Sequence, residues 1–271
     1  MRPRPHAASS SANAFPTPEF SLHCMISSPN PSLDRLRGAD RVSSVVVRVY
    51  RADRHVATSE ALVAGHQAVL SAYGIRKLVT FNTSWIGNPE VIVIAALADG
   101  GTRVLGGARM YRGATVDELP MYQAVGDQDP GMGRWFEPFG SEGAWELAGL
   151  WNSMELAGMG VEATYLVRAA MAAMPLVSAR HLFALTSPVT RRMQAALGFG
   201  TEPEVGDGGF FTYPTDRLRA TIARFTFPEN LEDATPEVRE QLREVWADPM
   251  GFEHAVDGPK GALRIRFELE L

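Results

Sequence analysis

Several features are scarce in this 271-residue chain, and each scarcity excludes a class of protein. Cys24 is the only cysteine, so no disulfide can form within the chain, which fits a reducing compartment such as the cytoplasm. No apolar run reaches the roughly 18 residues that a membrane span needs. Lys and Arg number 26 against 31 Asp and Glu, a net charge of −5 that argues against a general nucleic-acid binder.

The signatures of several common sites are also missing. The six histidines have no metal-ligand spacing and no acidic residue completes one, so we expect no metal. No Gly-Lys-Ser/Thr triplet and no Gly-x-Ser-x-Gly motif occur, which excludes a P-loop and argues against a serine hydrolase. Residues 158–163 fit the dinucleotide fingerprint formally, but no acidic residue ends the next expected strand, 181–186, to hold a ribose.

What is present is typical of a globular α/β protein, with 45% hydrophobic and 21% charged residues. Residues 1–40 are rich in Ser, Ala and Pro and are expected to form a disordered or irregular tail, with Met25 an alternative start. Residues 41–228 are expected to form the main domain, and residues 229–271 a helix-strand extension packed on it.

Hydrophobic periodicity predicts the elements of this domain. Strands are expected at 45–50, 91–97, 103–110, 145–152, 181–186 and 263–271, helices at 58–71, 161–174, 189–197 and 235–246, a short helix near 119–125, and a hairpin over 201–213. Asp99-Gly100-Gly101 predicts a hairpin turn, and Gly149 inside a strand predicts a bulge. The alternating strand 263–271 either closes the chain's own sheet or pairs with a second copy in a homodimer.

The loop after strand 145–152 is the strongest local signal for a ligand. Gly158-Met159-Gly160 stand where a long helix is expected to begin. The first N–H groups of a helix lack intrahelical partners, and glycine lets a phosphate approach the backbone. The loop therefore suggests a pyrophosphate cradle, with a tight packing turn as the alternative.

The order of these pieces resembles the GNAT superfamily of N-acyltransferases over roughly residues 42–215. The resemblance rests on Glu155-x-x-Gly158-x-Gly160, the helix, strand and helix that follow, and the pair Gly198-Phe199. It implies a mixed, mostly antiparallel central sheet flanked by helices, and acetyl-CoA or a longer acyl-CoA as co-substrate. Glu155 replaces the family's usual Gln or Arg, and Gln194 stands where many members have a tyrosine acid.

A weaker similarity points to acyl-homoserine-lactone synthases within that superfamily. It is carried by Gly107-Ala108-Arg109-Met110, Leu119-Pro120-Met121 and Trp145-Glu146-Leu147-Ala148. Those enzymes have an arginine three residues after the glutamate, where this chain has Gly149.

Site residues follow from these placements. Glu146 is the candidate general base, with a structural ion pair as the alternative reading. Asn152 and Ser153 are candidate substrate or pantetheine contacts, with loop capping as the alternative. Arg109 either pairs with Glu146, which we slightly prefer, or binds a substrate carboxylate.

The remaining assignments are less specific. Tyr111 and Tyr165 are acid candidates without positional support, and Tyr213 is expected to pack in the hairpin. The expected cofactor-binding residues are Leu150, Trp151, Asn152, Leu156, Ala157, Gly158, Met159, Gly160, Val161 and Gln194.

The resulting expectation is an N-acyltransferase that moves an acyl group from acyl-CoA to a small-molecule amine. One alternative is a synthase of N-acyl amino acids or signals that uses acyl carrier protein. The other is a non-catalytic ligand-binding or assembly protein, which the departures at Glu155 and Gln194 favour.

Overall fold

The computed structural model describes residues 42–76, 78–156, 163–258 and 261–271. Its strands are β1 (Ser44–Arg51), β2 (Val91–Ala98), β3 (Arg103–Gly113), β4 (Ala144–Asn152), β5 (His181–Thr186), β6 (Gly200–Thr201), β7 (Phe211–Thr212), β8 (Arg219–Thr226), β9 (Glu253–Gly258) and β10 (Gly261–Glu270). Its α-helices are α2 (Val56–Ala72), α3 (Pro120–Val125), α4 (Met132–Gly143), α5 (Thr164–Ala173), α6 (Arg191–Ala196) and α7 (Pro236–Ala247).

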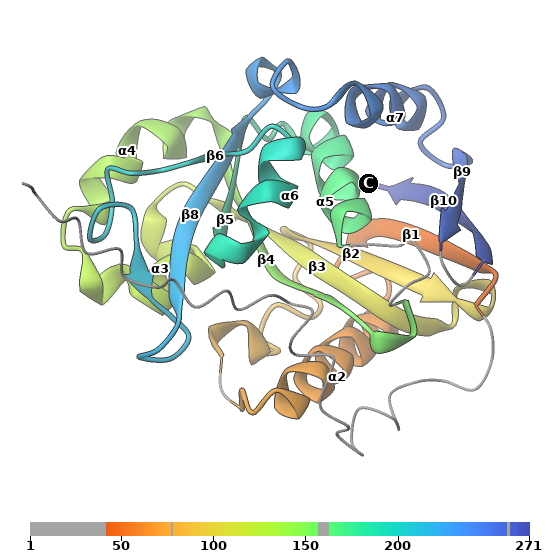
Figure 1. Ribbon diagram of the computed structural model, residues 1–271, viewed down its shortest axis with the longest axis horizontal. Coiled ribbons are helices and arrows are strands. Elements are labelled where there is room, and N and C mark those ends of the chain that lie inside the picture. Colours follow the sequence, from red (N-terminus) through yellow and green to blue (C-terminus); the bar gives the residue numbers. More distant parts are fainter. Residues whose placement is uncertain (1–41, 77, 157–162, 259–260) are drawn as a thin grey trace, which may run out of the picture. The chain divides into compact units, whose positions relative to one another are not determined.

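The strands join into one mixed, mostly antiparallel sheet. Their order is β6-β8-β5-β4-β3-β2-β1-β10-β9, with β7 paired to β8 off this path. The pairs β1–β10 and β4–β5 are parallel. Helices flank the sheet (Figure 1), so the expected fold class is confirmed.

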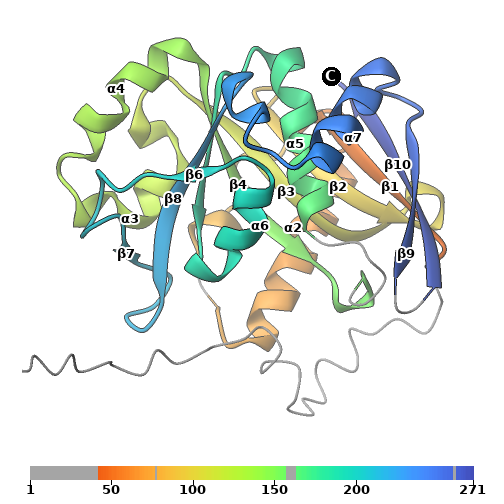
Figure 2. The same ribbon diagram turned by 45° about the horizontal axis from the view of Figure 1, so that its top comes forward.

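Apolar residues on both faces make this sheet the core. All of β2 is buried, as is typical of a strand covered on both sides. Val45 and Val47 of β1 pack in the cluster that contains α5 and α7, whereas Tyr50 packs with Leu62 of α2. Helix α2 therefore covers one face, and α5 and α7 cover the other (Figures 1 and 2).

Strand β4 carries the bulge predicted from Gly149. Gly107 pairs with Trp151 and Arg109 pairs with Ala148, so two residues of β4 stand opposite one residue of β3. Gly149 has a φ of 64°, in the left-handed region that glycine tolerates. A bulge bends its strand and re-aims the backbone groups beside it.

Beyond their first residues, β4 and β5 separate. Their ladder joins residues 144–146 to residues 181–183. On its other side β4 stays paired with β3 to Asn152, and β5 stays paired with β8 to Thr186. In the described part of the chain, residues 147–152 of β4 therefore have no ladder partner on the side that faces β5. Residues 184–186 of β5 likewise have none on the side that faces β4.

The expected strands from 45–50 to 181–186, the hairpin at Asp99–Gly101, the short helix near 119–125 and the helix over 235–246 are confirmed. The terminal strand is also confirmed, because β10 alternates buried and exposed residues. It pairs with β1, so it closes the chain's own sheet. Helix 189–197 is present as a 3-10 turn followed by α6, and helix 161–174 is present from Thr164, its first residues lying outside the described part.

Two expectations are met only in part. The first helix begins at Val56, before the expected cap Thr58, because the Ser59 backbone N–H donates to the His55 carbonyl at 3.0 Å and so closes the first helical turn. The expected hairpin over 201–213 is limited to an antiparallel bridge between Asp207 and Phe210, because β6 and β7 each pair with β8 instead of with each other.

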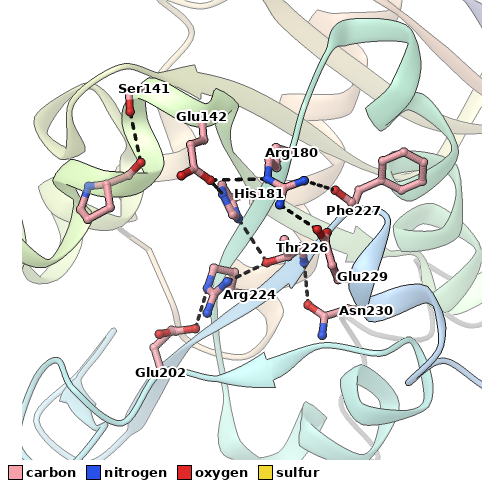
Figure 3. Close-up of polar contacts among 11 residues, drawn as sticks. Ser141, Glu142, Arg180, His181, Glu202, Arg224, Thr226, Phe227, Glu229 and Asn230 are labelled. Atoms are coloured by element: carbon pink, nitrogen blue, oxygen red, sulfur yellow. Dashed lines mark hydrogen bonds and ion pairs between the residues drawn. The ribbon is translucent and has the colours of Figure 1, made fainter.

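A polar network ties the start of β5 to its neighbours (Figure 3). His181 is buried, and its Nε2 lies 2.9 Å from Glu142 of α4 while its Nδ1 lies 3.2 Å from Thr226 of β8. Arg180 donates to Glu229 at 2.7 Å. Burial lowers the pKa of His181, and the hydrogen bond to His181 lowers the pKa of Glu142. Both shifts make the folded state resist protonation, so this network loses stabilising energy as the pH falls.

In the described part of the chain, no helix is long and apolar enough to cross a membrane. The same residues contain no cluster of three or more His, Cys, Asp or Glu that could hold a metal ion.

Candidate active site

A cavity of about 350 Å³ opens where β4 and β5 separate. Its walls include residues 147–150 of β4 and 184–186 of β5, and most of them are apolar. Toward α2 and α3 it is lined by His66 and Met121, and toward α5 and α6 by Val167 and Gln194. The cavity thus reaches both faces of the sheet through the opening between the two strands.

Glu146 is the carboxylate of this cavity. Its side chain is 2% exposed, and its Oε2 accepts a 2.8 Å hydrogen bond from the Met121 backbone amide at the start of α3. Burial raises the pKa of Glu146 to about 8, against the opposing effects of that hydrogen bond and of the Arg109 charge. A carboxyl group with a pKa near neutrality is well suited to accept a proton during a reaction.

Arg109 lies on β3, diagonally across from Glu146, and is fully buried. Its Nη2 donates to the Thr80 carbonyl at 2.7 Å, and its guanidinium stacks 4.7 Å from the Trp85 ring. Nε and Nη1 have no hydrogen-bond partner among the described residues. Within the described residues Arg109 forms no ion pair with Glu146, so the pairing that the sequence favoured is wrong. Register explains this, because the direct partner of Glu146 is Tyr111.

Gly149 leaves the room that Arg109 occupies. A Cβ built on Gly149 would lie 2.4 Å from Nη2 of Arg109. Thr80 and Gly149 both line the cavity, so the guanidinium lies directly behind this wall.

His66 also lines the cavity, although no sequence motif marked it as a candidate. It lies on α2, 4% exposed, between Phe81 at 5.2 Å and a parallel Trp151 ring at 6.4 Å. Burial lowers the pKa of His66 to about 4, and the Arg109 charge adds to this effect. The signal was present: His66 follows Leu62 by four residues and so shares its buried helix face.

We expect acid to destabilise the wild-type protein more than the variant H66F. The unfolded imidazole binds a proton below about pH 6.5. The folded one resists protonation down to about pH 4, so acid favours the unfolded state. Phe keeps the aromatic contacts and cannot titrate, and the difference should reach about 2 kcal/mol at about pH 5. Urea unfolding of both proteins at about pH 7.5 and about pH 5 measures it, and an equal loss in both would contradict the assignment.

The three tyrosines considered from the sequence differ in whether they line the cavity. Tyr213 lines it from the turn after β7, whereas Tyr111 and Tyr165 are not among its lining residues. Burial raises the pKa of Tyr213, the Glu146 charge raises it further, and a hydrogen bond with the Val79 backbone opposes both. The sequence placed Tyr213 in a hairpin and did not predict that it lines the cavity.

The other residues expected to bind the cofactor lie in different parts of the structure. Leu150 and Gln194 line the cavity, and the buried Oε1 of Gln194 has no hydrogen-bond partner in the described part of the chain. Trp151 stacks on His66, and Leu156 is buried in the core. The assignments to Ala157, Gly158, Met159, Gly160 and Val161 lie outside the described residues.

Asn152 is the last residue of β4, and Ser153 follows it. With its amide oriented for hydrogen bonding, Asn152 accepts from the Ala163 backbone N–H at 3.1 Å, just before α5. The Ser153 backbone N–H donates to the Leu105 carbonyl at 2.7 Å, while its buried hydroxyl has no hydrogen-bond partner within the ranges that the structure describes. Asn152 thus joins the end of β4 to the start of α5, as the loop-capping alternative expects.

Comparison with known proteins finds similarity in structure. No protein-family profile and no curated protein matches the chain. FeeM, an N-acyl amino acid synthase from uncultured soil microbes, superposes with a TM-score of 0.50 at 17% identity, covering 70% of this chain and 94% of FeeM.

Two further solved structures are similar over much of their length. For MesI, a CoA-dependent acyl-homoserine lactone synthase, the TM-score is 0.47 at 14% identity, with 74% of this chain and 95% of MesI covered. For an acyl-CoA N-acyltransferase from Pseudomonas aeruginosa it is 0.44 at 14% identity, with 65% and 95% covered. From the sheet described above and its similarity to FeeM, the chain has a GNAT-like fold.

Proposed function

We propose that this protein is an N-acyltransferase that moves an acyl group from a thioester to a small-molecule amine. The observation that carries the proposal is the opening between β4 and β5, with the buried carboxyl group of Glu146 in its wall. The GNAT-like fold supports it, because members of that superfamily place a thioester at this strand.

The thioester would lie between the two separating strands. Residues 147–152 and 184–186 offer backbone groups that the sheet leaves without ladder partners. An extended, amide-containing arm can pair with such groups in the manner of an added strand. The unpartnered Oε1 of Gln194 can accept a further N–H from it. Backbone N–H groups near residues 150–152, beyond the bulge, would stabilise the oxyanion that develops on the thioester carbonyl.

The acceptor would enter from the side of α2 and α3, where Glu146 lies beside the Met121 amide. The amine nitrogen attacks the thioester carbonyl and forms the new C–N bond. Glu146 accepts the proton that the nitrogen loses. The C–S bond then breaks, and the thiolate leaves with its electron pair and takes a proton from solvent. Gln194 cannot act as the acid that a tyrosine supplies in many GNAT proteins.

A group of exposed arginines near the cavity favours acyl carrier protein as the alternative acyl donor. Arg191 and Arg192 at the start of α6, and Arg217 and Arg219 near the start of β8, are exposed. None of the four forms an ion pair within the described part of the chain, and Arg219 lines the cavity. In a chain with a net charge of −5, this basic rim would attract an acidic carrier protein.

Thiol release tests the proposal. Purified protein is mixed with acetyl-CoA, long-chain acyl-CoA or acyl carrier protein thioesters and a panel of amines, and free thiol is followed with a chromogenic reagent. Acceptor-dependent release is expected with at least one donor. Binding without turnover would support the non-catalytic alternative. The absence of both binding and turnover would contradict the proposal.

We further expect G158V and G160V to abolish thioester binding while the fold survives. The reason is the expected cradle, in which only glycine lets the pyrophosphate approach the backbone. Titration of each variant with acyl-CoA, beside circular dichroism, measures both effects. G200A provides the control, because a Cβ added to Gly200 would meet no atom of the described chain within 4 Å. Unchanged affinity in G158V and G160V would contradict the cradle.

A further inference from the structure

His66 is a buried polar side chain in an otherwise apolar part of the cavity wall. It lies on α2, is 4% exposed and lines the cavity. The lining residues that follow it in sequence, Leu70, Ile75 and Leu78, are apolar. Burial of a polar group is costly unless the group finds a hydrogen-bond partner. His66 therefore marks a point of the wall at which a polar partner is expected.

Among the residues that the structure describes, His66 has no such partner. Its contacts are aromatic, with Phe81 edge-on at 5.2 Å and Trp151 nearly parallel at 6.4 Å. Burial and the Arg109 charge lower the pKa of His66 to about 4, and no hydrogen bond contributes to this shift. The ring is therefore neutral at about pH 7, with one N–H to donate and one nitrogen lone pair to accept.

Two glycines bring α2 close to the sheet beside this imidazole. A Cβ added to Gly65 would overlap the ring of Trp151 in β4, and a Cβ added to Gly107 of β3 would overlap the Leu62 side chain of α2. Together with the ring contacts, this close packing holds the imidazole against the cavity. Its unused hydrogen-bonding capacity is therefore available to a ligand in the cavity.

Two other polar side chains of the cavity already have partners. Glu146 accepts the 2.8 Å hydrogen bond from the Met121 amide and is the proposed base for the reacting amine. Tyr213 has a hydrogen bond with the Val79 backbone. His66 is thus left for a second polar group of the acceptor, one that enters the cavity together with the amine.

We infer that the acceptor is an amino alcohol whose hydroxyl group binds His66 while its amine reaches Glu146. This inference rests on the proposed function and names the substrate class of the same site. A hydroxyl group both donates and accepts hydrogen bonds, so it suits whichever ring nitrogen faces the cavity. A carboxylate could use only the N–H. A second ammonium group could use only the lone pair, and the nearby Arg109 charge would repel it.

Matched pairs of amines test the inference without any mutation. Linear amino alcohols of increasing chain length are compared with the n-alkylamines in which a methyl group replaces the hydroxyl. At the length that spans from Glu146 to His66, we expect kcat/KM for the amino alcohol to exceed that of its alkylamine by about tenfold or more. The hydrophobic effect alone would give the opposite order in an apolar cavity. Equal values at every length, or higher values for alkylamines, diamines or aminoalkanoic acids, would overturn the inference while leaving the proposed function intact.

Variants locate the source of this preference. H66F should abolish it, because phenylalanine keeps the ring contacts and has no nitrogen. H66N retains a donor and an acceptor and should keep part of it. In both variants KM should change for the acceptor and not for the thioester. Gln67, the exposed next residue of α2, gives the matched control Q67M, which should behave as wild type. An unchanged preference in folded H66F protein would overturn the role of His66.

Heteronuclear NMR of protein with isotope-labelled histidine follows acceptor binding separately from turnover. Amino alcohols of the series, added with and without free CoA, should shift an imidazole nitrogen signal that H66F lacks, whereas the matched alkylamines should not. No shift in either condition at saturating amino alcohol would overturn the inference, even if H66F does not fold. A shift without acceptor-dependent thiol release from any donor would instead overturn the proposed function.

Discussion

E146Q is expected to lower the rate of acyl transfer by about 100-fold to 10,000-fold while the protein remains folded. Glutamine keeps the shape of the side chain and can still accept the 2.8 Å hydrogen bond from Met121, but it cannot take a proton from the amine. Steady-state thiol release measures the loss. E137Q, at an exposed position of α4, is the matched control and should retain wild-type activity.

The pH dependence of kcat/KM for the wild-type enzyme should also report on Glu146 as the base. Glu146 must be ionised to act as a base, so kcat/KM should rise with pH through about 8, where burial places its pKa. Acceptors whose amines have different pKa values separate the two titrations, because the Glu146 step stays in place while the amine step moves. A profile that follows the acceptor alone would count against Glu146 as the base.

The contribution of Glu146 to the free energy of unfolding should fall as the pH rises, whereas kcat/KM should increase. The folded state keeps the Glu146 proton up to about pH 8, whereas the unfolded carboxyl loses it near pH 4.5. The folded state therefore binds more protons across this range, and this group's contribution to the unfolding free energy falls as the pH rises. E146Q removes that loss, so its stability relative to wild type should increase with pH.

G149V is the second large effect that the structure predicts. At a φ of 64°, valine costs backbone energy, and its Cβ would lie 2.4 Å from Nη2 of the buried Arg109. We expect a loss of about 2–4 kcal/mol in the free energy of unfolding and at least about 100-fold in turnover, because the bulge would have to rearrange.

Gly133 provides the comparison for G149V. It lies in α4, and a Cβ there would meet no atom of the described residues within 4 Å. G133A should therefore leave turnover unchanged and be neutral or stabilising by up to about 1 kcal/mol. Equal effects of the two substitutions would show that the bulge is not required.

Local pattern was enough to predict the strands that build the site. Gly149 within an apolar run predicted the bulge, and Asp99-Gly100-Gly101 predicted the hairpin before β3. Both signals are set by residues adjacent in sequence. The separation of β4 from β5 has no such local signal, because it depends on partners more than 30 residues apart.

Elements stabilised by distant contacts were missed. Helix α4 contains Gly133, Pro138 and Gly140, which normally disfavour a helix. It forms because Trp135 and Phe136 pack against Phe183 of β5, at ring distances of 5.6 and 5.4 Å.

Strands β8 and β9 were missed for the same kind of reason. Strand β8 pairs with β5, β6 and β7, so its neighbours rather than its own pattern define it. Strand β9 is a polar segment that pairs only with β10 along the described sheet.

The candidate site was predicted in part. Glu146, which lines the cavity, was singled out because a carboxylate on a central strand stands out from its apolar neighbours. His66 and Tyr213 were not, because α2 and the turn after β7 reach the cavity only through the fold. The absence of an Arg109–Glu146 ion pair follows from strand register, which the sequence alone does not specify.

Isothermal titration with acetyl-CoA, a long-chain acyl-CoA and free CoA decides whether the opening between β4 and β5 receives a thioester. We expect saturable binding of at least one of them, with heat that disappears in G149V but not in G133A. No binding of any of the three, together with no binding of an acyl carrier protein thioester, would contradict it.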